Sequence, residues 1–349
     1  MGGAEEGMLD ESAVAAEAFA ILLALKPDLA SRYGPAALPR CREDLRHHVR
    51  FLYRAHLLGS DALLDDYLGW LKVLFSARKI PDDELLASFR CIAHALGRRV
   101  SEADAAALQA LVERAIFAYP RISAEALDWS KECVDPGSPA TAYLRALLDG
   151  RRELAEEYVA ELMNEGLSIR DLYLEVFQPS QRELGRLWMK GLINPAQEHF
   201  ASACTQYIIS TNYPAMFAAA RQRRNGRLLI AAATPGERHE IGLRMVADLL
   251  ELEGWETRYL GADVPADALV AMALDFKADA VALSAAMATS ASELAPLIRA
   301  LRAQAPRLKI VVGGRAFIVD GELTARLGAD GSADDCAAAL ELMRGLSAG

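Results

Sequence analysis

The pattern of apolar and polar positions changes near residue 222. From residue 10 to about 222, apolar residues recur three and four positions apart with few β-branched runs, which predicts helices. After a basic, polar stretch, short apolar runs alternate with helical patterns at 237–253, 265–276 and 291–304. The runs are Leu228–Ala231, Ala280–Ser284 and Ile310–Val312. This alternation is typical of a parallel sheet with crossover helices, so we expect a doubly wound α/β domain over residues 223–349.

The helical part is itself interrupted. Asp135-Pro136-Gly137-Ser138-Pro139 places two prolines and a glycine within five residues, which indicates a linker. We therefore expect a multidomain chain, with an all-α domain over residues 1–135 and a second helical domain over 136–222. The second has room for roughly four helices, enough for a four-helix bundle. In the first, Ser60 is expected to cap one helix and Ser101 to precede another.

Composition and charge narrow the function. The chain has 349 residues, 52% apolar and 25% charged, as a packed protein of two or three domains requires. Its net charge of -10 supplies no basic field for a polyanion, so we expect no direct nucleic-acid partner. No apolar run reaches the roughly 18 residues of a membrane span, and the acidic start lacks the features of a signal peptide. We expect a cytoplasmic protein with no membrane partner, whose five widely spaced cysteines are reduced thiols.

The loop after the first expected strand carries candidate chemistry. It reads Thr234-Pro235-Gly236-Glu237-Arg238-His239-Glu240-Ile241-Gly242. Parallel sheets bind ligands at the carboxyl ends of their strands, so His239 lies where a ligand is expected. An imidazole nitrogen is a good metal donor, and the Glu237 carboxylate can accept the other ring N–H. A flavodoxin-like fold with an incidental histidine is the alternative interpretation.

The E-x-H-x-x-G pattern resembles the D-x-H-x-x-G motif of cobalamin-binding domains of the methionine synthase type, with Glu where Asp is usual. Further matches follow in the family's order: Leu260-Gly261-Ala262-Asp263-Val264-Pro265, Ser284-Ala285-Ala286 and Gly313-Gly314. The resemblance implies a Rossmann-like domain in which His239 is the lower axial ligand to cobalt and the cofactor's nucleotide tail threads into the fold. The implied cofactor-binding set is Glu237, Arg238, His239, Gly242, Ser284, Ser290, Gly313 and Gly314.

Individual members of this set have distinct expected roles. Glycines without a Cβ let the backbone approach a bulky nucleotide tail, and Ser284 can form a hydrogen bond to it. By resemblance, Ser290 is a further member of the histidine relay, although Ala286 and Met287 depart from the family's consensus.

A second pattern lies in the expected bundle. Trp188 ends one predicted helix, and Asn194-Pro195 starts the next, so Glu198 and His199 lie in its opening turns. This W-x9-E-H pattern resembles the cap of adenosylcobalamin photoreceptors of the CarH type. The resemblance implies that Trp188 packs on the adenosyl group, Glu198 accepts hydrogen bonds from its ribose hydroxyls and His199 supports the pocket. The alternative is a core tryptophan and a glutamate favoured by the helix dipole.

One position departs from the CarH type. That family has a histidine directly after the tryptophan, which can bind cobalt from above after illumination. Here the position is Met189, which excludes a second histidine ligand at this place. His199 is the candidate substitute.

The first 135 residues show nothing like the winged helix of the CarH type. Instead, four arginines recur at i, i+4 spacing: Arg42, Arg46, Arg50 and Arg54. They form either a site for carboxylates or phosphates or a solvated face partly neutralised by Glu43 and Asp44. A helical domain joined to a cobalamin cap resembles photocobilins, which implies a bilin such as biliverdin near Arg46, His47, His48, Arg50, Tyr67 and Trp70.

These observations predict a light sensor and not an enzyme. It would bind adenosylcobalamin, and biliverdin by resemblance, and illumination would change its cap or its homo-oligomeric assembly and signal to an unidentified output partner. A corrinoid methyl carrier serving a methyltransferase is the alternative. A third interpretation makes the N-terminal domain a docking module without a chromophore.

Overall fold

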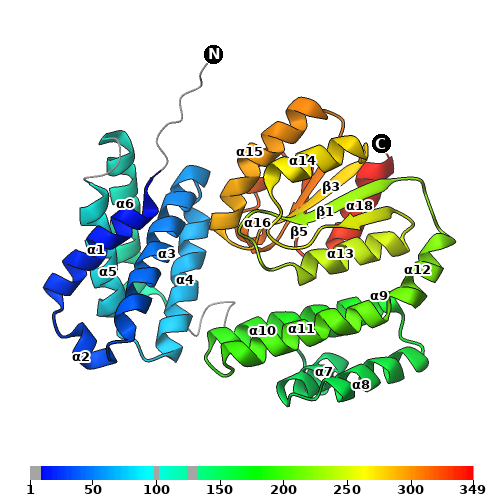
Figure 1. Ribbon diagram of the computed structural model, residues 1–349, viewed down its shortest axis with the longest axis horizontal. Coiled ribbons are helices and arrows are strands. Elements are labelled where there is room, and N and C mark those ends of the chain that lie inside the picture. The colour runs from blue at the N-terminus through cyan, green and yellow to red at the C-terminus, as the bar shows by residue number, and fades with distance from the viewer. Residues whose placement is uncertain (1–8, 98–101, 124–132, 349) are drawn as a thin grey trace. The chain divides into compact units, whose positions relative to one another are not determined.

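The computed structural model describes residues 9–97, 102–123 and 133–348. The chain divides into two compact units, Met1–Leu127 and Asp128–Gly349 (Figure 1). Each unit is described by itself below.

The first unit is helical throughout its described residues. Ser60 accepts a hydrogen bond from the backbone N–H of Leu63 at 3.2 Å, which confirms it as the N-cap of its helix. Ser101 lies outside the described residues, and the helix expected after it begins at Glu102. The elements are α1 (Glu11–Leu25), α2 (Leu29–Tyr33), α3 (Ala37–Leu58), α4 (Asp61–Ala77), α5 (Asp82–Leu96), α6 (Glu102–Ala118) and the short η1 (Tyr119–Arg121).

The second unit begins with the helices expected for the bundle. Asn194 caps the longest of them through a reciprocal pair of hydrogen bonds with Gln197, both 3.0 Å, which confirms the helix start predicted at Asn194-Pro195. Helices α9, η4 and α10 follow one another directly, with η4 in π geometry. The elements are α7 (Pro139–Leu148), α8 (Arg152–Asn164), α9 (Ile169–Asp171), η4 (Leu172–Phe177), α10 (Gln178–Met189), α11 (Pro195–Thr211) and α12 (Tyr213–Arg221).

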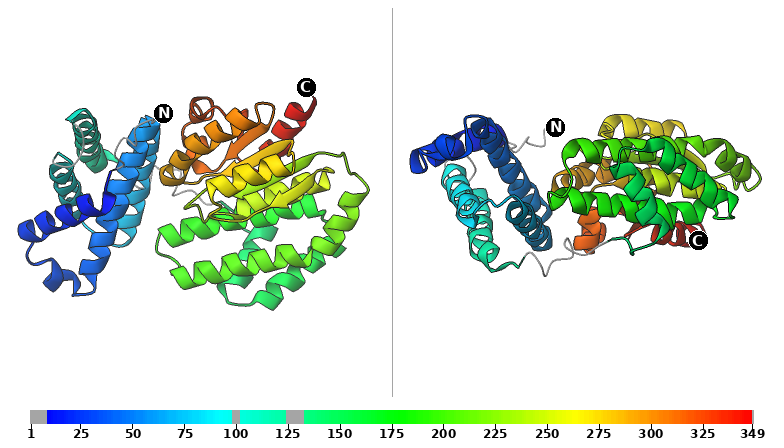
Figure 2. Two further views of the ribbon diagram at one scale, coloured as in Figure 1. Left: turned by 45° about the horizontal axis from the view of Figure 1, so that its top comes forward. Right: turned by 90° about the horizontal axis from the view of Figure 1, so that it is seen from below.

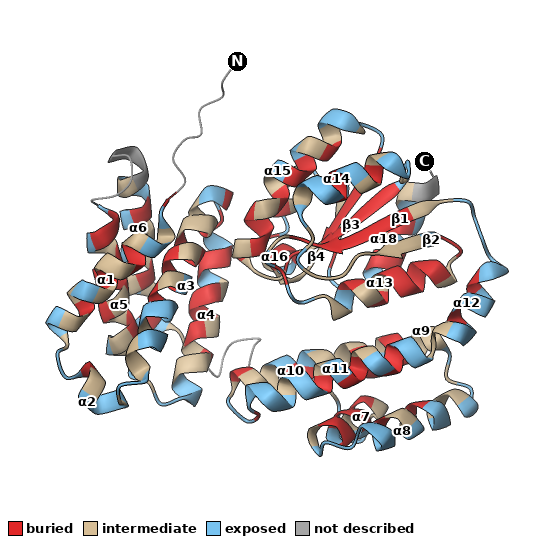
Figure 3. Cartoon of the chain, viewed as in Figure 1, coloured by how far each residue is buried: buried red, intermediate tan, exposed pale blue. Residues whose placement is uncertain are grey.

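The α/β part contains a parallel sheet, as the alternating pattern predicted. Within the described residues it has five strands in the order β2-β1-β3-β4-β5. The three predicted strands are confirmed as β1 (Leu228–Ala233), β3 (Ala280–Ser284) and β4 (Lys309–Gly313). The pattern missed β2 (Glu256–Tyr259) and β5 (Gly331–Ala333), since these short edge strands contain no apolar run. Figure 3 shows β1 and β3 as buried and β2 as only half-buried.

The crossover helices include the three that the pattern predicted, but two of them start elsewhere: the third begins at Ala288, three residues before its predicted start at 291. The first begins at Ile241 and not at 237, because residues 237–240 form a loop around the buried Glu237 carboxylate. The helices are α13 (Ile241–Leu252), α14 (Ala266–Asp275), α15 (Ala288–Gln304), α16 (Arg315–Val319), α17 (Leu323–Leu327) and α18 (Cys336–Ala348).

Strand order determines where loops from different parts of the chain meet. Strand β1 lies between β2 and β3, so this is the place where the order of the strands reverses. In the register, Ala233 pairs with Ser284, and Ser284 pairs with Gly313. The loops after β1, β3 and β4 therefore leave the sheet at the same edge.

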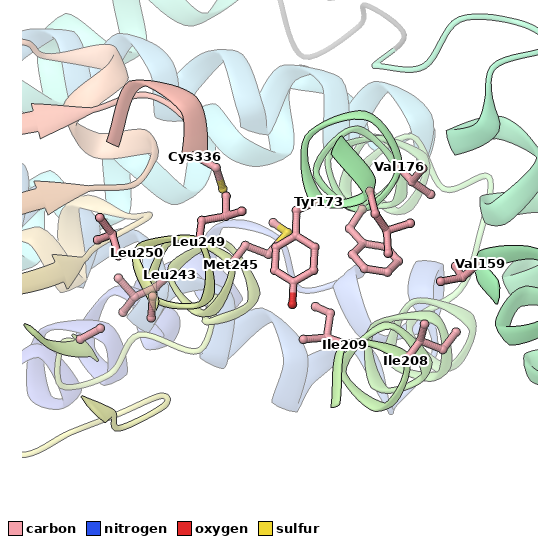
Figure 4. Close-up of a cluster of buried hydrophobic side chains, with 14 of the residues drawn as sticks. Val159, Tyr173, Val176, Ile208, Ile209, Leu243, Met245, Leu249, Leu250 and Cys336 are labelled. Atoms are coloured by element: carbon pink, nitrogen blue, oxygen red, sulfur yellow. The ribbon is translucent and has the colours of Figure 1, made fainter. Parts of the chain in front are cut away.

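The bundle and the α/β part share one hydrophobic core. Figure 4 shows Tyr173 of η4, Ile209 of α11 and Met245 of α13 side by side in this core. Both views of Figure 2 show the bundle helices alongside the α/β part. The domain boundary predicted at residue 222 thus lies inside the second unit, and the division into three domains stays a prediction.

A buried carboxylate also joins the two parts. Asp248 of α13 accepts hydrogen bonds from the hydroxyls of Tyr173 at 2.9 Å and Tyr213 at 3.2 Å. Burial raises the pKa of Asp248 to about 6, although these hydrogen bonds oppose the shift. The charged carboxylate is therefore disfavoured in the folded protein.

This pKa predicts a pH dependence of stability. Because the folded-state pKa of Asp248 is above the unfolded value, its contribution to stability is complete below about pH 4 and is lost as the pH rises through about 6. Between pH 4.5 and 7.5, the free energy of unfolding should fall by about 2 kcal/mol more in the wild type than in Asp248→Asn. Urea unfolding at the two pH values measures this difference. An equal fall in the free energy of unfolding in both proteins would contradict the prediction.

None of the described helices is both long enough and apolar enough to cross a bilayer.

Candidate functional site

His239 and Glu237 form the centre of the site, in the loop between β1 and α13. The ring Nδ1 of His239 lies 2.6 Å from Glu237 Oε1, and the backbone N–H of His239 donates to the same oxygen at 2.8 Å. The carboxylate of Glu237 is 2% exposed, whereas the imidazole is 73% exposed. A buried acceptor therefore fixes the ring, and Nε2 is the nitrogen that remains for a metal.

The second oxygen of Glu237 is held by the loop after β3. Glu237 Oε2 accepts hydrogen bonds from the Ser290 hydroxyl at 2.7 Å and from the backbone N–H of Ala286 at 2.6 Å. Ser290 is buried at the start of α15. The structure thus brings His239, Glu237 and Ser290 into one chain of hydrogen bonds.

The pKa shifts describe a charged pair. Burial alone would raise the pKa of Glu237, but the hydrogen bonds from His239 and Ser290 outweigh it and bring the pKa to about 2. The hydrogen bond to Glu237 raises the pKa of His239, and the negative charges of Glu237 and Glu198 add to this effect. A metal would therefore displace the proton on Nε2, while Glu237 keeps the proton on Nδ1 and makes Nε2 a more basic donor.

Asp263 belongs to the Leu260–Pro265 motif, and no individual role was predicted for it. Asp263 accepts a hydrogen bond from the Gly236 N–H at 2.7 Å, and its own N–H donates to the Glu237 carbonyl at 3.0 Å. Its backbone φ of 54° is in the left-handed region, which aspartate tolerates better than most residues. Asp263 therefore holds the histidine loop from the far side.

The three expected glycines have different structural settings. Gly314 has φ 102°, and a Cβ there would lie 2.4 Å from the Ala285 carbonyl oxygen, so the fold itself requires glycine. A Cβ on Gly313 would make an ordinary contact of 3.4 Å, and one on Gly242 would meet nothing within 4 Å. Of these three glycines, only Gly242 therefore has open space where a ligand could approach. Glycine is needed at position 314 because the loop packs closely against the Ala285 carbonyl.

The remaining α/β candidates lie at or near the same edge. Ser284 ends β3 between the partners Ala233 and Gly313, so it shares the edge of the sheet with the histidine loop. Arg238 is exposed beside His239.

The bundle candidates lie at the facing ends of α10 and α11. Trp188 is half-buried and packs against the hydrophobic core. This contact agrees with the alternative of a core tryptophan, but the side chain is not fully buried. Glu198 accepts a hydrogen bond from the Ser202 hydroxyl at 2.8 Å and lies 2.5 Å from His199 Nδ1. Since the charge of Glu198 also acts on His239, the two predicted motifs belong to one electrostatic environment.

Met189 does not take the place of a ligand histidine. Its side chain is 1% exposed at the end of α10. The side chain of His199 in α11 is 79% exposed, so the accessible imidazole of the bundle is at position 199 and not at position 189.

The candidate bilin residues of the first unit are largely engaged with one another and with acidic residues. Arg46 and His47 both pair with Glu43 of the same helix, and Arg50 Nε donates to Glu11 of α1 at 2.7 Å. Of the two interpretations of the arginine stripe, the pairs with Glu43 fit the partly neutralised face, and the contact from Glu11 adds to it without having been predicted.

The aromatic candidates of this unit form a buried cluster. His48 Nδ1 lies 2.7 Å from the Tyr67 hydroxyl, and Tyr67 stacks on Phe51 with ring centroids 3.7 Å apart. Trp70 lies 5.9 Å from Tyr67, also stacked. Burial lowers the pKa of His48 to about 3, so this imidazole is neutral. Bilin binding at these residues stays a prediction.

Family comparisons match both parts of the second unit. A model described as "B12 binding domain" matches residues 227–341, and a second model with the same description matches residues 140–211.

The curated proteins similar to this chain include transcriptional repressors and corrinoid proteins. The HTH-type transcriptional repressor CarA of Myxococcus xanthus is 33% identical over 165 residues, which are 46% of this chain and 54% of that protein. CarH of the same organism is 33% identical over 144 residues, 41% of this chain and 46% of that protein. Trimethylamine corrinoid protein 1 of Methanosarcina mazei is 27% identical over 177 residues, 50% of this chain and 82% of that protein. The chain thus spans about half the length of CarA and CarH.

A solved structure shares the fold. The monomethylamine corrinoid protein of Methanosarcina barkeri superposes with a TM-score of 0.52 at 21% identity, covering 59% of this chain and 96% of that one. Together with the two family matches, this identifies the second unit as a cobalamin-binding module, in which a helical B12-binding domain precedes a Rossmann-like one.

Proposed function

We propose that this protein is a light sensor that binds adenosylcobalamin, with His239 as the lower axial ligand to cobalt. The observation that carries the proposal is the chain of hydrogen bonds from His239 through the buried Glu237 carboxylate to the Ser290 hydroxyl. The relationship to CarA and CarH supports a regulatory role. The protein is proposed as a binding protein and not as an enzyme.

Different residues of the chain would bind the two faces of the corrin ring. When bound, adenosylcobalamin supplies a light-sensitive cobalt–carbon bond. His239 would bind the cobalt, with its ring orientation set by Glu237. Trp188 and Glu198 would contact the adenosyl group. Loss of the adenosyl group would remove these contacts, and this difference in binding free energy would shift the bundle.

Illumination of the loaded protein tests this proposal. The visible spectrum of the adenosylcobalamin complex should change under green light, and the elution volume in size-exclusion chromatography should change with it. A dark-stored sample is the control. An unchanged spectrum together with an unchanged oligomer would reject the light sensor.

The first unit is proposed as a second sensory part that binds biliverdin. Arginines beside the aromatic cluster of Tyr67 and Trp70 have the chemistry that propionates and a conjugated tetrapyrrole require. Protein produced with biliverdin should gain a far-red absorption band. If the band is missing, this unit is better explained as a docking module for the output partner.

A corrinoid carrier is the second candidate, because the corrinoid protein of Methanosarcina mazei is matched over 82% of its length. In this case the helical domain would admit a methyl donor, and the protein would need no adenosyl-binding residues. Assembly into a homo-oligomer is part of the sensor proposal and not of the carrier.

Glu198→Ala distinguishes the two functions. In a sensor, loss of the carboxylate that accepts from the ribose should weaken adenosylcobalamin binding about tenfold. Methylcobalamin has a methyl group in place of the adenosyl group and its ribose, so its affinity should be unchanged. Titration of both cofactors measures the difference, with Glu161→Ala on the exposed face of α8 as a matched control. Equal affinities in Glu198→Ala and wild type would favour the carrier.

A further inference from the structure

Helix α13 begins directly after the histidine loop, and the residue next to His239 is bonded to the bundle. Glu240, the N-cap residue of α13, accepts a hydrogen bond on Oε1 from Gln206 of α11 at 3.2 Å. Its other oxygen, Oε2, accepts from the Tyr259 hydroxyl of β2 at 2.8 Å. Glu240 therefore connects the sheet, the histidine loop and helix α11.

A second residue of α13 strengthens the same connection. Arg244, one turn after Glu240, donates to the Gln206 carbonyl at 3.3 Å, to the Ser210 hydroxyl at 2.7 Å and to the Tyr213 hydroxyl at 2.9 Å. These three acceptors belong to α11 and α12. The start of α13 thus follows the position of the bundle helices, because charge-assisted hydrogen bonds hold it to them.

Helix α11 carries both ends of the connection. Glu198 and Gln206 are eight residues apart on this helix, which corresponds to about two turns or roughly 12 Å. A continuous helix transmits a displacement at one of these positions to the other. The Glu198 carboxylate and the Gln206 amide, which donates to Glu240, therefore move together.

We propose that Glu240 and Gln206 are positioning residues that couple the orientation of His239 to the position of helix α11. This inference rests on the proposed function, because it takes His239 as the cobalt ligand. Glu237 anchors the histidine to loops of the sheet, and Glu240 anchors it to the bundle. A shift of helix α11 then changes the orientation of the His239 ring as well as the position of Glu198.

Gln206→Met tests the coupling, because methionine has a similar length but no amide donor. Gln181→Met is the matched control, since the Gln181 amide donates to Thr205 at 3.0 Å within the bundle. In the cofactor-free protein, exchange of the first hydrogen-bonded amides of α13, residues 244–247, should become about tenfold faster in Gln206→Met and stay unchanged in the control. After loading with cob(II)inamide, which lacks the benzimidazole of cobalamin, the share of cobalt with an axial nitrogen, read by electron paramagnetic resonance, should also fall only in Gln206→Met.

Two results separate this inference from the proposed function. Equal exchange rates and equal axial-nitrogen signals in Gln206→Met and Gln181→Met would overturn the coupling. An axial-nitrogen signal that survives His239→Ala would instead overturn the proposed ligand, while the exchange rates still report on the connection. If Gln206→Met does not fold, Gln206→Asn, one methylene shorter, replaces it with the same expected results.

Discussion

His239→Ala should lower cobalamin affinity by about 100-fold or more, because it removes the nitrogen that would bind cobalt, and even changes to groups around a ligand cost 10–100-fold. The protein should still fold, since Glu237 keeps its hydrogen bonds from the backbone N–H groups of His239 and Ala286 and from the Ser290 hydroxyl. Titration with hydroxocobalamin and the visible spectrum of the complex measure the loss. The combination of weak binding and a retained fold is specific to a ligand role.

His94→Ala provides the control for this substitution. His94 is an exposed histidine on α5 of the first unit, so its removal should change neither affinity nor spectrum. If His239→Ala bound cobalamin with the wild-type spectrum, His239 would not be the cobalt ligand.

Glu237→Ala should have the largest effect on stability, lowering the free energy of unfolding by about 3 kcal/mol. The substitution leaves the Ala286 N–H and the Ser290 hydroxyl without the carboxylate that now accepts from both. The Ser290 hydroxyl keeps the Met287 carbonyl as an acceptor at 3.0 Å, so the loss falls mainly on the backbone N–H groups of Ala286 and His239, at about 1–3 kcal/mol for each buried donor. Urea unfolding of the cofactor-free protein measures the loss, so the result does not depend on cobalamin.

Glu157→Ala on the exposed face of α8 is the matched control and should change stability by less than about 0.5 kcal/mol. Glu237→Asp adds a second comparison, because aspartate is the usual residue of the D-x-H-x-x-G motif but is one methylene shorter. A wild-type unfolding free energy for Glu237→Ala would mean that its hydrogen bonds contribute little to the fold.

Much of the α/β part was predictable from its sequence. The apolar run at Ala280–Ser284 is a strand with the predicted bounds, because a buried central strand needs apolar residues on both faces. Edge strands β2 and β5 were not predictable in this way, since a half-buried strand tolerates polar residues.

The site was predictable to a different degree at each residue. His239 and Glu237 were found because their motif lies within three residues of the chain. Ser290 was expected only by resemblance, and its hydrogen bond to Glu237 spans 53 positions. Gly314 was expected to face the cofactor, yet its contact with the Ala285 carbonyl explains the glycine without one.

The sequence alone determined the local features: the capped helix starts at Ser60 and Asn194, which strands are central, and that a histidine follows the first strand. These depend on hydrogen bonds and side-chain periodicity over a few residues. Tertiary structure alone decided which distant groups meet, such as Arg50 with Glu11, Tyr173 with Asp248 and Gln206 with Glu240. Such pairs follow from how whole helices pack, and packing is set by the complete core rather than by any one segment.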